Sequence, residues 1–155
     1  MKKGILYFSL IVASGVTITN LYTSIVDVAS WGSDIPASIE AARQYYKSYN
    51  PGSFFRIFSP LNQFLALACV ITFWRQGKNV RIPLIAAFVL YFTAEGLTFM
   101  YFFPRNDIMF TIGASMDVEK IRATWQEWST MNWVRTFIVA TGVIFTSIAL
   151  HRVYF

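Results

Sequence analysis

The chain has 155 residues, of which 55% are hydrophobic, 18% are aromatic and only 14% are charged. A soluble domain carries about 25% charged residues, so this composition excludes an ordinary soluble domain and predicts a membrane protein. One cysteine, Cys69, and one histidine, His151, exclude an intramolecular disulfide, a CxxC motif and a bis-histidine haem.

Four apolar stretches of roughly 20 residues can be drawn, each long enough to cross ~30 Å of hydrocarbon as a helix. We expect them at about residues 4–26, 54–74, 83–103 and 133–150. The first follows two lysines, but it is long for a signal peptide and lacks a clean A-x-A site. Little chain remains for a second domain. The sequence therefore predicts one all-α domain over residues 1–155, a four-transmembrane-helix bundle.

The first polar loop, residues 31–53, predicts a short extracytoplasmic helix. Pro36 suits a first helical turn, and an amphipathic pattern follows to about residue 49. Ser53 is a candidate cap for the second span.

The second polar loop contains two helix boundaries. Proline in the segment Pro104 to Asp107 predicts the end of the third span. After a break at residues 113–117, Asp117 is a candidate cap for a helix beginning near Val118. Its helical register continues into the last span, so we predict one unbroken helix from there to the C-terminal region.

Basic residues are distributed unequally between the two ends of the predicted bundle. One end carries Lys2, Lys3, Arg75, Lys78, Arg81 and Arg152 without an acidic residue. The positive-inside rule then places both termini in the cytoplasm and both polar loops outside. The net charge of +5 is thus explained by the topology of the protein in the membrane, and we predict no nucleic-acid partner. We expect an integral protein of a bacterial cytoplasmic membrane, in contact with lipids; homo-oligomerisation stays open.

Polar residues that are unfavourable inside a membrane gather in the outer half of the bundle. Arg135 lies just inside the last span and Glu95 lies deep in the third. Because a charge at such depth needs a partner, Glu95 is the best candidate partner of Arg135, and direct contact is left open. At similar depth we expect Asn20, Ser24, Asp27, Arg56, Asn62, Asn106 and Asn132, surrounded by tryptophans that include Trp31 and Trp128. Polar groups from four helices at one depth are typical of a bundle-core site.

Two interpretations stay open. In the first, the polar residues form a pocket for a lipophilic aromatic or lipid-like molecule, with Glu95, Arg135 and Asp27 as catalytic candidates. The candidates for substrate binding are Asn132, Asn106, Asn20, Arg56, Trp128 and Trp31. In the second, the protein is non-catalytic, either a ligand binder or a subunit of a larger complex, and these residues form a structural ion-pair network. A metal site from carboxylates alone would be weak, so we predict neither metal nor cofactor.

Several segments resemble a known family in chain order. The segment Trp128 to Thr136 resembles the W-x-x-[LW]-[HN]-x-[VA]-R-T signature of the anthrone oxygenase-like membrane proteins, which are small four-helix proteins. Residues 24–27 are similar to that family's N-x-V-E, residues 46–56 to its W-x-x-Y-x-R-x, and residues 104–107 to its P-x-N-x turn. The chain departs from the family at Ser24 for asparagine, Asp27 for glutamate and Asn132 for histidine.

The resemblance implies cofactor-independent oxidation of a polycyclic anthrone by dioxygen. Such chemistry needs a base that forms a carbanion and donors that hold an oxyanion. Glu95 or Asp27 would be the base, and Arg135, Asn132 and Asn106 would hold the oxyanion. The tryptophans would stack on the flat substrate.

Overall fold

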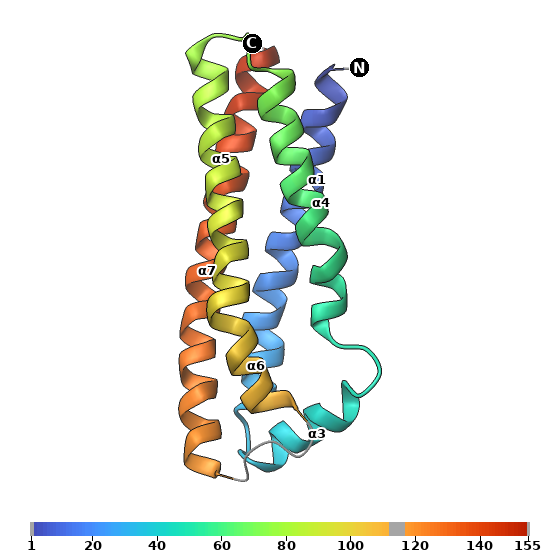
Figure 1. The fold of residues 1–155 in the computed structure, drawn as a ribbon, viewed down its shortest axis with the longest axis vertical. Coiled ribbons are helices and arrows are strands. Elements are labelled where there is room, and N and C mark those ends of the chain that lie inside the picture. Colours follow the sequence, from blue (N-terminus) through green and yellow to red (C-terminus); the bar gives the residue numbers. More distant parts are fainter. Residues whose placement is uncertain (1, 112–116, 155) are drawn as a thin grey trace.

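The computed structural model describes residues 2–111 and 117–154, and no strand occurs within these ranges. Four long helical rods stand side by side in one bundle (Figure 1). Both termini lie at one end, here called the terminal end, and α3 (Ala37–Tyr45) lies at the opposite, loop end. All four rods are long and apolar enough to cross a membrane. The all-α, four-helix prediction is therefore confirmed.

Two of the rods are built from several elements. The first consists of α1 (Lys2–Tyr22), η1 (Thr23–Asp27) and α2 (Val28–Trp31), and the third of α5 (Lys78–Leu97), η2 (Thr98–Phe102) and α6 (Phe103–Phe110). Here η1 and η2 are π-helical turns. The second rod is α4 (Pro51–Thr72) and the fourth is α7 (Val118–Tyr154).

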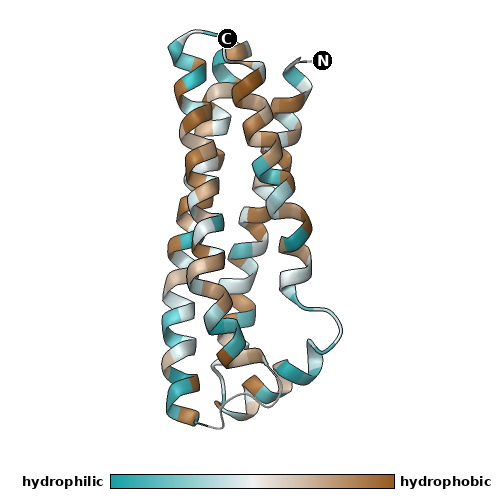
Figure 2. Cartoon of the chain, in the orientation of Figure 1, coloured by the Kyte–Doolittle hydropathy of each residue, from teal (hydrophilic) through white to brown (hydrophobic). Residues whose placement is uncertain are grey.

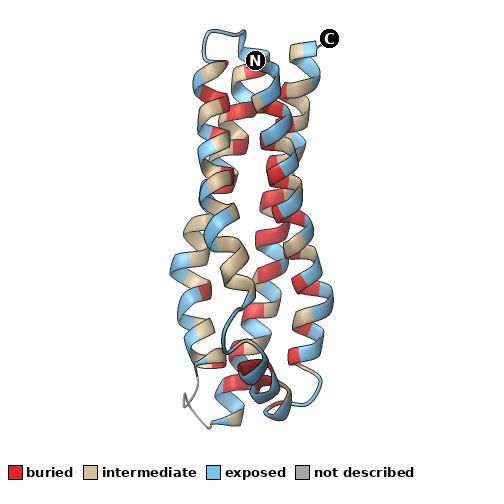
Figure 3. Cartoon of the chain, turned by 90° about the vertical axis from the view of Figure 1, so that its right-hand side faces the viewer, coloured by how far each residue is buried: buried red, intermediate tan, exposed pale blue. Residues whose placement is uncertain are grey.

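The outward faces of the rods are apolar. Large exposed hydrophobic side chains include Ile11, Ile18, Phe64, Ile71 and Phe137. Hydrophilic residues concentrate at the loop end and at the turn between α4 and α5 (Figure 2). Buried residues face the interior of the bundle (Figure 3). Apolar surface of this extent is unfavourable in water, and lipid is the environment that suits it.

The fourth rod begins at the residue that the sequence predicts. The backbone N–H of Lys120 donates to Asp117 Oδ1 at 3.1 Å, so Asp117 caps the helix. From Val118, α7 runs 37 residues to Tyr154 without interruption. At 1.5 Å per residue this helix is roughly 55 Å long, so it extends well beyond a ~30 Å hydrocarbon core. Of the predicted break at residues 113–117, only Asp117 belongs to the described residues.

The third rod does not end at Pro104, and that prediction was wrong. The chain passes through η2 into α6 and stays helical to Phe110. Proline disrupts a helix interior because its nitrogen cannot donate to the carbonyl four residues earlier. Pro104 instead lies in the first turn of α6, directly after a π-helical turn that has already changed the hydrogen-bond register.

The second rod begins earlier than predicted and is the least enclosed. Asn50 is the N-cap residue of α4, and Ser53 reciprocates in a capping box instead of being the cap itself. Pro60 interrupts the hydrogen bonding inside the helix. In the most apolar part of this rod only 22% of the residues are buried, against 28–39% in the others. The N-terminal half of α4 leans away from the other rods in Figure 1.

The short amphipathic helix α3 closes the loop end. It ends at Tyr45, four residues before the predicted end. Its buried Arg43 donates from Nε to the carbonyl of Met109 at 2.7 Å and from Nη2 to that of Ile108 at 3.3 Å. These carbonyls belong to the last turn of α6, where backbone acceptors lack helical partners. Arg43 therefore fastens α3 to the end of the third rod.

Candidate functional site

Asn132 and Arg135 form a buried pair on one face of α7. They are three residues apart, and they are 0% and 6% exposed respectively. Arg135 Nη2 donates to Asn132 Oδ1, and Arg135 Nη1 makes a longer bond of 3.4 Å to Thr98 Oγ1 on η2. Asn132 Nδ2 donates to Ser24 Oγ on η1 at 2.7 Å and to the Asn20 carbonyl at 3.4 Å. The pair thus connects the first, third and fourth rods.

Aromatic rings surround the guanidinium of Arg135. Its Cζ atom lies 4.0 Å from the Phe102 ring centroid, 5.4 Å from that of Phe55 and 5.9 Å from that of Trp128. A cation at this distance is attracted by the negative face of a ring, more strongly where water is excluded. The rings offset part of the cost of burying Arg135 without supplying a negative charge.

The two π-helical turns flank this pair. Ser24 belongs to η1, while Thr98 and Phe102 are the first and last residues of η2. A π-helical turn widens the helix and changes the direction of the residues that follow, and such turns are frequent at functional sites. η2 therefore supplies a hydrogen-bond acceptor for Arg135 and the aromatic ring nearest to its guanidinium, and η1 supplies an acceptor for Asn132.

Beside Arg135 lies a small polar cavity between the four rods. Its volume is about 20 Å³. It is lined by Val16 and Asn20 of α1, Phe55, Ser59, Asn62 and Gln63 of α4, Tyr91, Ala94 and Glu95 of α5, Thr98 of η2, and Arg135 and Val139 of α7. Glu95 and Arg135 interact electrostatically across this space, yet no ion pair within 4.0 Å joins them among the described residues. Glu95 interacts instead with the Ser59 side chain.

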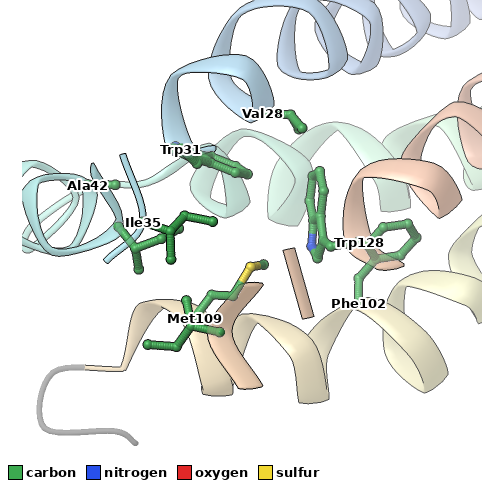
Figure 4. Packing of buried hydrophobic residues seen from close by; sticks show 9 residues of the cluster. Val28, Trp31, Ile35, Ala42, Phe102, Met109 and Trp128 are labelled. Atoms are coloured by element: carbon green, nitrogen blue, oxygen red, sulfur yellow. The ribbon is translucent and has the colours of Figure 1, made fainter. Parts of the chain in front are cut away.

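An aromatic cluster fills the bundle between this cavity and the loop end (Figure 4). The Trp128 ring lies 5.3 Å from the Trp31 ring and 5.2 Å from the Phe102 ring, in edge-to-face contacts. Trp128 Nε1 donates to Asn106 Oδ1 at 2.8 Å. The indole thus contacts two rings and is hydrogen-bonded at its polar atom.

The structure brings some of the predicted site residues together and separates others. Asn20, Glu95 and Arg135 line the cavity, and Asn132 adjoins it through its bond to Arg135. Trp31 and Trp128 belong to the aromatic cluster instead, and Asn106 accepts the hydrogen bond of Trp128. Asp27 and Arg56 are not among the cavity residues.

Asp27 and Arg56 lie in other surroundings. Arg56 is exposed on α4. Asp27 is half-buried and interacts with Thr23 of its own turn. Asp27 also acts on Tyr46, the residue that follows α3. The pKa of the Tyr46 phenol is raised by burial and, to a smaller extent, by the negative charge of Asp27.

Sequence reasoning missed Ser59, Gln63 and Thr98 as site residues. Ser59 and Gln63 are four apart on α4, and Thr98 follows Glu95 by three. Residues at these spacings share one helical face, so the positions of Glu95 and Asn62 could have pointed to them. Among the described residues there is no cluster of three or more His, Cys, Asp or Glu side chains that could hold a metal ion.

Comparison with known families identifies one that matches more than half of the chain. The sequence profile of the anthrone oxygenase family matches residues 52–145. The chain belongs to the anthrone oxygenase family. The matched region contains Glu95, Asn132 and Arg135, while Asn20 and Ser24 precede it. No curated protein and no solved structure matches the chain. Membership in the anthrone oxygenase family confirms the resemblance drawn from the segment Trp128 to Thr136.

Proposed function

We propose that the chain is a membrane oxygenase that oxidises a lipophilic aromatic molecule with dioxygen and without a cofactor. The observation that carries this proposal is the placement of Glu95 and Arg135. They line one small polar cavity from two different helices, and no ion pair within 4.0 Å joins them. A carboxylate that is not bound by the guanidinium stays available as a base, and the guanidinium stays available to an oxyanion.

The proposed reaction divides these roles between the two charged groups. Glu95 takes a proton from an activated CH₂ group of the substrate, which leaves an electron-rich carbanion. Arg135, oriented by Asn132, holds the negative charge delocalised onto the substrate oxygen. The carbanion transfers electrons to dioxygen and forms a C–O bond, and the peroxide anion takes the proton back from Glu95 to give a hydroperoxide. Loss of water from the resulting hydroperoxide gives a carbonyl group, so the CH₂ carbon is oxidised and dioxygen is reduced.

Binding of a polycyclic substrate requires the site to open. A cavity of about 20 Å³ is far below the ~300–1,000 Å³ typical of ligand pockets. Phe55 is a half-buried cavity residue on the N-terminal half of α4, the least enclosed rod, and Pro60 follows it on the same helix. We propose that the substrate enters from the lipid by displacing Phe55. The loop end would then face outward and both termini the cytoplasm, as the basic residues at the terminal end favour.

A non-catalytic role is the second candidate, and a specific observation favours it. Side chains fill the space toward the loop end, where the Trp128 ring contacts both the Trp31 and the Phe102 rings. In this case the Asn132–Arg135 pair and its partners orient the helices, and the protein binds a lipid or serves as a subunit of a larger complex.

Two substitutions test the proposed reaction in purified, lipid-reconstituted protein. We expect Glu95→Gln and Arg135→Ala to abolish oxygen uptake with a polycyclic anthrone, while both proteins still insert into membranes. Glu119→Gln and Arg122→Ala, at exposed positions of α7, are the matched controls and should retain turnover. Normal turnover in both site variants would sink the assignment.

Mass spectrometry of co-purified small molecules separates the two candidate functions. An oxygenase site should retain an aromatic substrate or product in the wild type, and Glu95→Gln should accumulate the unoxidised form. The same lipid in both proteins, together with no oxygen uptake by the wild type, would favour the non-catalytic role.

A further inference from the structure

Four buried polar atoms that lack a partner among the described residues belong to side chains that line the cavity. Within residues 2–111 and 117–154, the fully buried side-chain atoms that make no hydrogen bond are Asn20 Oδ1, Asn62 Oδ1, Gln63 Oε1 and Arg135 Nε. All four residues line the same cavity. More than nine in ten buried polar groups in proteins have a partner, because an unpartnered one destabilises the fold. Four such atoms at one place therefore point to a bound polar molecule.

The chemistry of the four atoms restricts what that molecule can be. Gln63 Nε2 donates to the Tyr91 carbonyl at 2.8 Å, which identifies Oε1 as the amide atom that is left as an acceptor. Asn20 Oδ1 and Asn62 Oδ1 are acceptors as well, whereas Arg135 Nε is a donor. The guanidinium disfavours a cation and the amide oxygens disfavour an anion. A neutral molecule that both donates and accepts hydrogen bonds meets both requirements.

Size points to the same molecule. The cavity volume is about 20 Å³, and one water requires about 10–15 Å³ by this measure together with two to four polar partners. Asn20, Asn62 and Arg135 are 1%, 3% and 6% exposed, so bulk solvent does not reach their side chains freely. The space suits one or two waters and excludes a ring system.

We propose that this cavity is a binding site for ordered water that links Glu95 to Arg135. A water that accepts from Arg135 Nε donates to the oxygens of Gln63 and Asn62. The Glu95 carboxylate and Asn20 Oδ1, whose residues also line the cavity, accept from the same water or from a second one. The two charged groups then interact through water instead of through a direct ion pair. This site does not depend on the proposed oxygenase activity.

A substitution with opposite outcomes for a hydrated and a dry cavity tests the proposal. Asn62→Leu keeps the number and branching of the side-chain heavy atoms and removes their polarity. If water occupies the site, leucine removes one of the hydrogen-bond partners that hold this water, and Arg135 Nε is left without an acceptor. We therefore expect the thermal midpoint in detergent to fall by roughly 2–4 °C. If the site is dry, leucine removes an amide oxygen that has no partner, and the midpoint should stay the same or rise.

Two further measurements complete the test. Thr93→Val replaces an exposed polar residue of α5 outside the cavity, and it reports any general effect of added hydrophobicity in detergent. An experimental structure of the wild-type protein should show density for water within about 2.7–3.2 Å of Arg135 Nε. An unchanged or raised midpoint for Asn62→Leu, or a side chain filling the cavity in that structure, would overturn the proposal.

Discussion

Replacing Asn132 is the most direct test of the site, because this side chain is the nearest hydrogen-bond acceptor of the buried Arg135 guanidinium. In Asn132→Leu, Arg135 keeps only the 3.4 Å bond to Thr98 and the surrounding rings, since its Nε has no partner in the described chain. Ser24 Oγ also loses the donor at 2.7 Å that connects α7 to η1. We therefore expect stability to fall because the amide oxygen no longer accepts from Arg135 and the amide nitrogen no longer donates to Ser24.

The magnitude follows from the bonds that are lost. A hydrogen bond to a charged group contributes about 1.5–3 kcal/mol. The neutral bond to Ser24 contributes about 0.6–1 kcal/mol, as is typical between membrane helices. The 3.4 Å contact with the Asn20 carbonyl is too long to add much. Asn132→Leu should thus lower the free energy of unfolding by about 2–4 kcal/mol, whereas Ser24→Ala should lower it by only ~1 kcal/mol.

Reversible unfolding in mixed detergent micelles, titrated with a denaturing detergent, measures both values. Arg135→Met provides the second arm of a double-mutant cycle. Once the guanidinium is absent, replacing Asn132 by leucine should cost only ~1 kcal/mol, the value expected for the Ser24 bond alone. Equal costs of Asn132→Leu in both backgrounds, or a variant as stable as the wild type, would refute the role of Asn132 as the acceptor for Arg135.

Two further predictions concern neighbours of the cavity. A Cβ atom on Gly142 would lie 2.3 Å from Tyr91 Cε1, so Gly142→Ala should destabilise the packing of α7 against α5 by ~1–3 kcal/mol. The matched control Gly15→Ala meets no atom within 4 Å and should be neutral or stabilising in the same unfolding titration. Under the proposed entry route, Phe55→Ala should raise and Phe55→Trp should lower the rate of anthrone oxidation, measured as oxygen uptake. Identical rates in both Phe55 variants would contradict entry past this side chain.

Local features of the chain were predictable from the sequence. The lengths of the apolar stretches predict four spans, because crossing a bilayer as a helix sets a minimum length. Asp117 predicts the start of α7, because a cap acts on backbone groups only two or three residues away. The segment Trp128 to Thr136 likewise identifies the family, since its residues are contiguous.

Relations between helices were decided only by the tertiary structure. Pro104 continues the third rod because a π-helical turn precedes it, and the stability of such a turn depends on its contacts with neighbouring rods. Glu95 and Arg135 do lie on one cavity, yet the hydrogen bonds of Arg135 go to Asn132 and Thr98. Helical periodicity shows which residues share a face, but the rotation of one helix against another follows from the packing of all four. That rotation determines the small size of the cavity that Glu95 and Arg135 both line.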